Sequence, residues 1–258
     1  MKIYILADME GISGIRMIEQ VQRDKPEYAQ GCRLMMDDVN VAVDACFDAG
    51  ADEVLVCDTH GGGGQLELEK MDPRATYETP NNGVMMPGLD DSFDGVILLG
   101  HHARAGTLNG FLDHTMSSQA WFECRINDVV VGEVGVEAAW AGWHDVPVIA
   151  VTGDEAVATE ATQLLEKVEC AAVKRGIGRN RARCDSIETA HEKIRETIRK
   201  AISEIEKARP YTPKSPVTFR ITYYRSDMAD EKAKAAEWKR IDARTVEREM
   251  ADFRDFRL

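Results

Sequence analysis

The sequence predicts an α/β fold: a three-layer sandwich with a largely parallel central sheet, a hairpin and a smaller C-terminal α+β portion. Short apolar runs bounded by turn-forming residues alternate with segments of helical periodicity. Asn127-Asp128 between two apolar runs and a strand-like segment near residue 220 favour antiparallel additions. We expect residues 1–184 to form the main α/β core and residues 185–258 a smaller helix and strand portion that need not be a separate domain.

The opening stretch, MKIYILADMEGISG, predicts a buried strand that ends in two carboxylates. Five apolar residues lead into Asp8 and Glu10, and turns are expected at Gly11 and Gly14. The pleat of a strand places residues two apart on one face, so the two carboxylates lie close together. Like charges this close favour a cation between them, and one or two metal ions are the candidates. The alternative is that Asp8 caps the turn and Glu10 faces solvent.

The next segments place further metal-competent side chains after strands. A helix over Glu27–Ala49 should end at Gly50, because glycine commonly terminates helices. A strand over Glu53–Cys57 leads into Asp58, His60 and four glycines, and a strand over Gly95–Gly100 ends in His101 and His102. Before the helix we expect a loop or short lid at 12–25. Between the two strands we expect a short helix at 66–71 and an extended piece near residue 76.

The second half of the chain continues the alternation of strands and helices. Glu133 opens a helix that directly follows the predicted hairpin. Ile187, Ile194, Ile198, Ile202 and Ile205 form one apolar stripe on a long helix. Up to residue 174 we expect strands at 121–126, 129–131, 147–152 and 169–174, with helices at 134–143 and 156–165. Beyond it we expect a basic linker at 182–184, a helix at 185–208, a break at 210–216 and a strand at 217–224. A helix, a short strand and a charged tail should follow.

Candidate ligands therefore cluster at predicted strand ends. Three of the six histidines lie at these strand ends, and His114 lies in the loop that follows the third. His144 at a helix end and His191 on the long helix are expected to be structural or exposed. Carboxylates with imidazoles suit zinc, or manganese or iron where oxygen ligands dominate. Because a parallel sheet gathers its carboxyl ends at one edge, these side chains are expected to meet. The set is Asp8, Glu10, Asp58, His60, His101, His102 and Glu133.

Composition limits the partners of the chain. The formal net charge of −13 argues against nucleic acid and against an anionic membrane surface. Six scattered cysteines without a C-x-x-C pair are typical of reduced thiols in a cytoplasmic protein. No apolar run is long enough to span a membrane, and the N-terminus lacks a signal segment.

Five ordered motifs resemble those of the zinc-dependent D-aminopeptidases, the M55 metallopeptidases of dipeptide-transport operons. They are A-D-M-E-G-I-S-G, C-D-T-H, L-G-H-H-A-R-A-G-T, D-H-T-M and I-N-D-x-x-x-G-E-x-G, within about residues 1–155. The resemblance implies a dinuclear site with two zinc ions per subunit and a catalytic role for His114. It leaves open the role of His101, and we favour Asp8 as the bridging carboxylate. The implied metal ligands are Asp8, Glu10, His60, His102 and Glu133.

The function expected from this resemblance is removal of N-terminal residues, D-amino acids in particular, from short peptides by metal-activated water. His114 would protonate the leaving amine or stabilise the oxyanion. Arg104 either pairs with a substrate carboxylate or bonds a backbone carbonyl. The alternatives are another dinuclear hydrolase, acting on a cyclic amide or a phosphoester, and a non-catalytic metal- or peptide-binding protein. The family also implies a homo-oligomeric ring, with a decamer as one candidate size.

Overall fold

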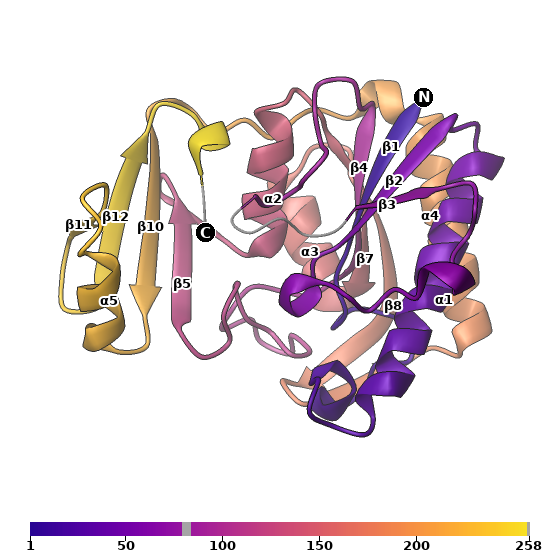
Figure 1. The fold of residues 1–258 in the computed structure, drawn as a ribbon, viewed down its shortest axis with the longest axis horizontal. Coiled ribbons are helices and arrows are strands. Elements are labelled where there is room, and N and C mark those ends of the chain that lie inside the picture. The colour runs from indigo at the N-terminus through magenta and orange to yellow at the C-terminus, as the bar shows by residue number, and fades with distance from the viewer. Residues whose placement is uncertain (79–83, 257–258) are drawn as a thin grey trace.

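The computed structural model describes residues 1–78 and 84–256 and has the predicted three-layer α/β architecture (Figure 1). Within the described residues the central sheet has the strand order β3-β2-β1-β4-β7-β8-β9, and every neighbouring pair is parallel except β8 with β9. Its strands are β1 (Lys2–Ala7), β2 (Glu53–Asp58), β3 (Thr76–Glu78), β4 (Gly95–His101), β7 (Val148–Asp154), β8 (Glu169–Gly178) and β9 (Arg181–Cys184).

The strand order explains where a ligand site can form. The chain runs outward from β1 through β2 to β3 and then returns to the other side of β1 as β4. The order therefore reverses beside β1, and the crevice beyond the carboxyl ends of strands at such a reversal is where ligands bind in open α/β sheets. Asp8 follows β1 and His102 follows β4, so both lie at this reversal.

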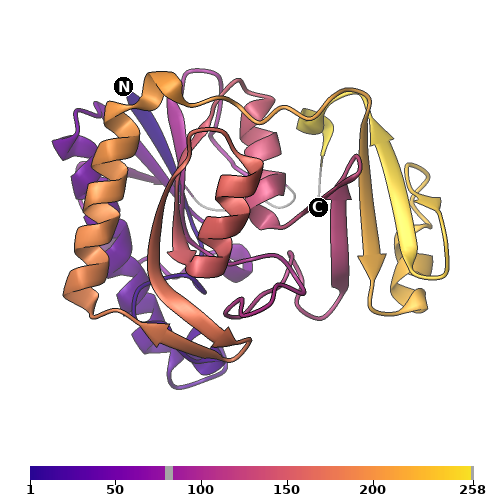
Figure 2. The same cartoon turned by 180° about the vertical axis from the view of Figure 1, so that it is seen from behind.

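Helices cover both faces of the central sheet. α1 (Tyr28–Asp48) and α4 (Ile187–Ser203) pack on one face, and α2 (Glu133–Gly142) and α3 (Glu155–Leu164) on the other (Figure 2). Gly50 ends α1 as predicted: with a φ of 96° it donates its N–H to the Phe47 carbonyl, and Ala51 donates to the Cys46 carbonyl. This is the Schellman arrangement, which satisfies carbonyls that the helix end leaves without partners.

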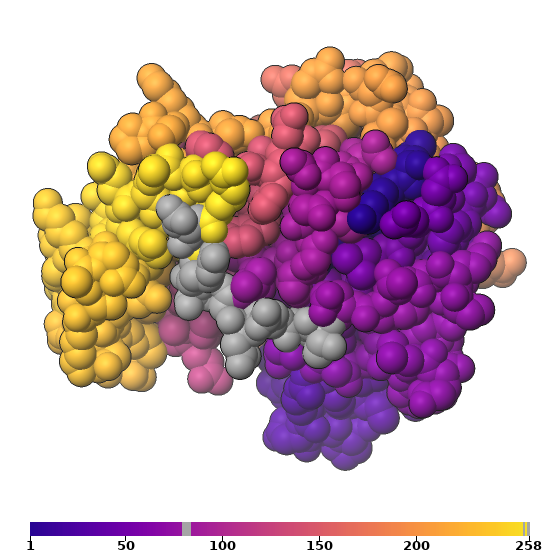
Figure 3. Space-filling view, turned by 45° about the horizontal axis from the view of Figure 1, so that its top comes forward, coloured from indigo at the N-terminus to yellow at the C-terminus, as the bar shows by residue number. Residues whose placement is uncertain are grey.

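A second, antiparallel sheet lies beyond α2 and gathers the C-terminal segments at one end of the molecule (Figures 1 and 3). Phe219 anchors it and contacts the rings of Trp121, Trp238 and Phe256. Within the described residues its order is β11-β12-β10-β5-β6. Its elements are β5 (Trp121–Ile126), β6 (Val129–Val131), β10 (Val217–Tyr223), β11 (Lys239–Arg240) and β12 (Thr245–Met250), with α5 (Ser226–Lys232) packed against it.

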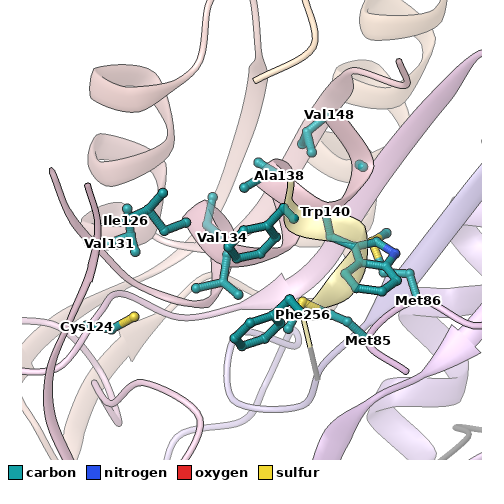
Figure 4. Packing of buried hydrophobic residues seen from close by; sticks show 14 of the residues in the cluster. Met85, Met86, Cys124, Ile126, Val131, Val134, Ala138, Trp140, Val148 and Phe256 are labelled. Atoms are coloured by element: carbon teal, nitrogen blue, oxygen red, sulfur yellow. The ribbon is translucent and has the colours of Figure 1, made fainter. Parts of the chain in front are cut away.

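The central position of α2 explains its composition. All ten of its residues are buried, because the parallel sheet and the second sheet enclose it from two sides. The sequence leaves open whether Trp140 and the pair Met85-Met86 belong to the core or to an interface. In the structure all three are buried and Trp140 packs among Met85, Met86 and Phe256 (Figure 4).

Two local predictions were wrong. Residues 182–184 are not a linker: β8 continues to Gly178, and Arg181–Cys184 return beside it as the edge strand β9. The arginines that suggested a linker suit an edge strand, where charge discourages pairing with other chains. The helix expected at 66–71 is a single 3-10 turn over Leu68–Lys70, since the segment is too short for a stable helix. The described part of the chain holds no helix with the length and hydropathy of a membrane span.

Candidate metal centre

The five residues that the family resemblance implies as metal ligands lie together at the carboxyl edge of the central sheet. His60 Nδ1 is 3.1 Å from Asp8 Oδ1 and 3.1 Å from Glu10 Oε2. On the other side, His102 Nε2 is 3.4 Å from Asp8 Oδ2 and 3.4 Å from Glu133 Oε1. The carboxylate of Asp8 therefore stands between two histidine–carboxylate groups, with one oxygen directed to each.

Backbone hydrogen bonds fix the strand ends that carry these side chains. Asp8 donates its N–H to the Leu99 carbonyl at 2.8 Å, and Gly11 donates to the Gly100 carbonyl at 2.7 Å. Gly11 is required sterically, because a Cβ there would lie 2.1 Å from the His101 carbonyl oxygen. The ends of β1 and β4 consequently approach more closely than a side chain at position 11 would allow.

Two buried carboxylates organise the side of the site that comes from α2. Glu133 is the first residue of that helix, where the helix dipole favours a negative charge, and its Oε1 accepts the Met116 N–H at 2.7 Å. Glu160 accepts the backbone N–H groups of Arg104 and Gly132 at 2.8 and 3.1 Å. Glu160 thereby ties the loop after β4 to the start of α2, so His102 and Glu133 are held on a common frame.

Each of three histidines uses its second ring nitrogen to bond a backbone carbonyl. His60 Nε2 lies 3.0 Å from the Val21 oxygen, His102 Nδ1 lies 3.0 Å from the Ala103 oxygen, and His114 Nδ1 lies 2.8 Å from the Leu112 oxygen. A carbonyl only accepts, so these nitrogens carry the proton. The other nitrogen of each neutral ring then presents a lone pair to the site, as metal-binding histidines do.

The donor set fits metal ions. Two ligands of a tetrahedral zinc ion, each bonded at about 2.0–2.1 Å, lie about 3.3 Å apart, close to the nitrogen–oxygen separations observed. Within the described residues, the buried atoms Asp8 Oδ2 and His102 Nε2 have no hydrogen-bond partner. Buried polar atoms are normally satisfied, so two that face each other indicate a cation site. Two groups could each hold an ion: Asp8, Glu10 and His60, and His102, His114 and Glu133.

The electrostatics of the site also favour cations. Burial alone would lower the pKa of His60, but the charge of Glu10 and hydrogen bonds with Asp8 and Glu10 raise that pKa to about 12. Burial would raise the pKa of Glu133, but the neighbouring charge of His102 lowers it to about 2. Glu133 thus stays ionised at neutral pH, and without metal His60 holds a second proton.

Lys174 supports the loop that carries Glu10. Its fully buried ammonium donates to the carbonyl oxygens of Glu10, Ile12 and Ile15 at 2.8, 2.6 and 2.8 Å. Burial lowers the pKa of Lys174 to about 8, so the charged form still predominates at neutral pH. Sequence reasoning missed this residue. Its signal was a lysine at the expected carboxyl end of a buried strand.

Two candidates from the sequence serve the surroundings of the site instead. Asp58 lies outside both ligand groups and accepts the Gln65 N–H at 2.7 Å, while Gln65 bonds the His60 carbonyl. His101 is fully buried and pairs with Glu137, with Nε2 2.7 Å from Oε2. Glu137 also escaped sequence reasoning, although it follows Glu133 by one helical turn and so shares its face.

The remaining candidates lie apart from the metal ligands. The Arg104 guanidinium lies 3.9 Å from Glu160, and Arg104 is absent from the described residues that line the cavity above the ligands. His191 lies on α4, with its Nε2 3.1 Å from Asp38 Oδ1. His144 is partly buried beside Trp140.

A cavity of about 620 Å³ opens over the two ligand groups. Asp8, Glu10, Glu133 and Glu137 contribute carboxylates to its lining, and His114 contributes an imidazole. This volume falls in the range of small-molecule sites. The arrangement can therefore admit a small substrate to a water-activating metal centre.

Comparisons with known proteins find relatives along most of the chain. The sequence model of the Peptidase_M55 family, described as D-aminopeptidase, matches residues 1–257. A D-aminopeptidase of Bacillus subtilis (strain 168) is 39% identical over 218 residues, which are 83% of this chain and 78% of the relative. The structure of the Zn-dependent D-aminopeptidase DppA from Bacillus subtilis, described as a self-compartmentalizing protease, superposes with a TM-score of 0.95. It is 34% identical and the match covers 99% of this chain and 93% of that one.

Proposed function

This chain belongs to the M55 D-aminopeptidase family, and we propose that it is a zinc-dependent aminopeptidase that removes N-terminal D-amino acids from short peptides. The observation that carries the proposal is the position of Asp8 between two histidine–carboxylate groups at the floor of a cavity. A family of hydrolases that includes a zinc-dependent member supplies the reaction class.

We infer a dinuclear centre with two zinc ions per subunit. Asp8, Glu10 and His60 would hold one ion, and Asp8, His102 and Glu133 the other. The support is that each oxygen of Asp8 faces a different histidine. Bound there, the ions would supply what the side chains lack, namely a lowered pKa for the attacking water and polarisation of the scissile carbonyl.

His114 is the proposed catalytic residue that moves a proton. Leu112 holds its Nδ1–H, so Nε2 is the atom that exchanges protons with the substrate. Nε2 lies 3.6 Å from Glu133 Oε1 at the cavity wall. In its protonated form, His114 would donate the Nε2 proton to the amine nitrogen released when the peptide bond breaks.

One solved relative also supports an oligomeric enzyme. Because one solved relative is described as self-compartmentalizing, we propose that this chain forms a closed homo-oligomeric ring, with a decamer as one candidate size. Exposed Phe122 and Tyr224, which contact each other edge to face on the second sheet, offer apolar surface for subunit contacts. Light scattering of the purified protein would measure the subunit number. We place the enzyme in the cytoplasm, since its six cysteines are free thiols.

Hydrolysis of matched dipeptides tests the proposed function. Zinc-loaded protein should cleave D-Ala-D-Ala faster than L-Ala-L-Ala, and chelator-treated protein should cleave neither. A nitrophenyl phosphate assay under the same conditions is the control for a general metallohydrolase. Cleavage of the phosphate ester without cleavage of either dipeptide would reject the proposal.

A further inference from the structure

The cavity over the ligand groups has charged side chains both at its floor and nearer its mouth. Its floor carboxylates are buried, with side-chain exposures of 5% for Asp8 and 4% for Glu137. Arg179 also lines the cavity, and its side chain is 41% exposed. Among residues 1–78 and 84–256, Arg179 is the one arginine or lysine in that lining. Within the described residues, the cavity thus combines buried carboxylates at its floor with one arginine nearer the solvent.

The position of Arg179 is fixed by the loop that carries His114. Arg179 belongs to the turn between β8 and β9, and its backbone carbonyl accepts the Leu112 N–H at 2.7 Å. Leu112 in turn holds the imidazole of His114. The turn and the loop that carries His114 are therefore joined, and the backbone of Arg179 is held at a set place relative to His114.

The guanidinium itself is only lightly engaged. Its Nε lies 3.6 Å from Asp113 Oδ1, beyond hydrogen-bond distance, and its Nη1 donates to the neighbouring Asn180 at 3.3 Å. Asp113 meanwhile accepts the Gly106 N–H at 2.7 Å with its other oxygen. A fork with long contacts of this kind can turn to bind a carboxylate through two parallel N–H donors.

We propose that Arg179 binds the C-terminal carboxylate of the substrate and so restricts the enzyme to short peptides with a free C-terminus. The proposal rests on the proposed aminopeptidase function. An aminopeptidase binds the amino end of its substrate at the reacting centre, which here is the pair of ligand groups. The carboxylate at the other end of a short peptide is then attracted to Arg179 and orients the substrate. A longer peptide would place its carboxylate past Arg179 and lose the pairing.

The test compares D-Ala-D-Ala with its C-terminal amide. The amide lacks the negative charge of the carboxylate that Arg179 would bind. For the wild type, kcat/KM should favour the free acid about tenfold, chiefly through KM, since a charge-assisted pair at a partly exposed site is worth about that factor. Arg179→Met should bring the acid-to-amide ratio close to one. Arg179→Lys should restore part of it, because an ammonium supplies charge without the fork.

Arg175→Met is the matched control. Arg175 lies four residues earlier, on β8. Its side chain is 59% exposed and pairs with Glu155, and it is absent from the described lining of the cavity. This variant should keep the wild-type ratio. A ratio near one in the wild type, or an unchanged ratio in Arg179→Met, would overturn the assignment. If Arg179→Met lowers kcat/KM equally for the acid and the amide, the ratio is unchanged and the assignment is overturned.

A binding measurement separates this inference from the proposed function. Calorimetric titration of zinc-free protein with the two dipeptides should give tighter binding of the acid in the wild type and no preference in Arg179→Met. If zinc-loaded protein cleaves neither dipeptide but the binding preference is present, the aminopeptidase function fails and the carboxylate site stands. If both dipeptides are cleaved without a preference in rate or binding, the function stands and the carboxylate site fails.

Discussion

The imidazole ring of His114 stacks on that of His102, with ring centroids 4.0 Å apart and ring planes 11° apart. Stacking and the Leu112 carbonyl fix the His114 ring beside the metal ligands. The same closeness makes His114 a geometrical candidate for a ligand. The proton-donor and ligand roles predict different metal contents, so mutation distinguishes them.

His114→Ala should retain two zinc ions per chain and lower kcat by about 10²- to 10⁴-fold, the usual contribution of a positioned proton donor. His102→Ala should lose zinc as well as activity, because it removes a direct ligand. Metal analysis of both purified variants by mass spectrometry checks this. If His114→Ala retains only one ion, His114 is a ligand and its assignment as the proton donor is wrong.

Zinc affinity should rise with pH. The pKa of His60 is about 12. Burial lowers the pKa of His102, but the neighbouring carboxylates of Glu133, Asp8 and Glu10 together raise it well above its ordinary value. At pH 7 the zinc-free protein therefore holds protons on both rings, and zinc must displace them. Since the zinc-free form binds more protons, raising the pH favours the zinc form. We expect about two protons released in total and about a tenfold gain in affinity per pH unit per proton.

Calorimetry of zinc binding in buffers of different ionisation enthalpy measures this proton release directly. The comparison is made between pH 6 and 8. An affinity that is flat over that range would show that both histidines are already neutral in the zinc-free protein.

Lys174→Met should destabilise the protein and weaken zinc binding. The substitution leaves the Glu10, Ile12 and Ile15 carbonyls buried without their donor, at a cost of about 3–5 kcal/mol in the free energy of unfolding. Lys193→Met is the control, because Lys193 is half-exposed and its pair with Asp185 should contribute less than about 1 kcal/mol. Urea unfolding in the presence of chelator measures the free energy of unfolding without bound metal. Zinc titration then measures how far the loss of Lys174 weakens zinc binding through Glu10. Equal stability of the two variants would contradict the role given to Lys174.

Gly11→Ala should disturb the site more than the fold around it. Its methyl group would meet the His101 carbonyl and push the ends of β1 and β4 apart, so zinc affinity should fall at least tenfold. Gly50→Ala provides the contrast: nothing lies within 4 Å of its Cβ, and its positive φ should cost about 1 kcal/mol of stability without affecting zinc binding. A normal zinc affinity in Gly11→Ala would show that the strand ends can separate without loss of the site.

The part of the site that the sequence predicted consists of side chains placed just after parallel strands. Asp8, His60 and His102 could be expected to meet because the carboxyl ends of neighbouring parallel strands share one edge. The sequence does not disclose that β1 lies between β2 and β4, which is what brings Asp8 into contact with both histidines. Strand order depends on long-range packing rather than on local periodicity.

Lys174 and Arg179, which the sequence did not indicate, contact segments that are distant in the chain. Lys174 bonds a loop more than 150 positions earlier, and Arg179 reaches the cavity because β8 continues and turns back as β9. A basic segment at 182–184 indicated a linker, whereas the structure shows an edge strand. Glu137 was accessible to reasoning through its spacing from Glu133. The division at residue 184 stays a prediction about folding units.

The most direct test is a stoichiometric zinc titration of metal-free protein, followed through the rate of D-Ala-D-Ala hydrolysis. With two groups sharing Asp8, activity should be absent without zinc and reach its maximum at two equivalents per chain, and Asp8→Ala should stay inactive throughout. Full activity in chelator-treated protein, or zinc bound by the chain with no turnover at any ratio, would contradict the account.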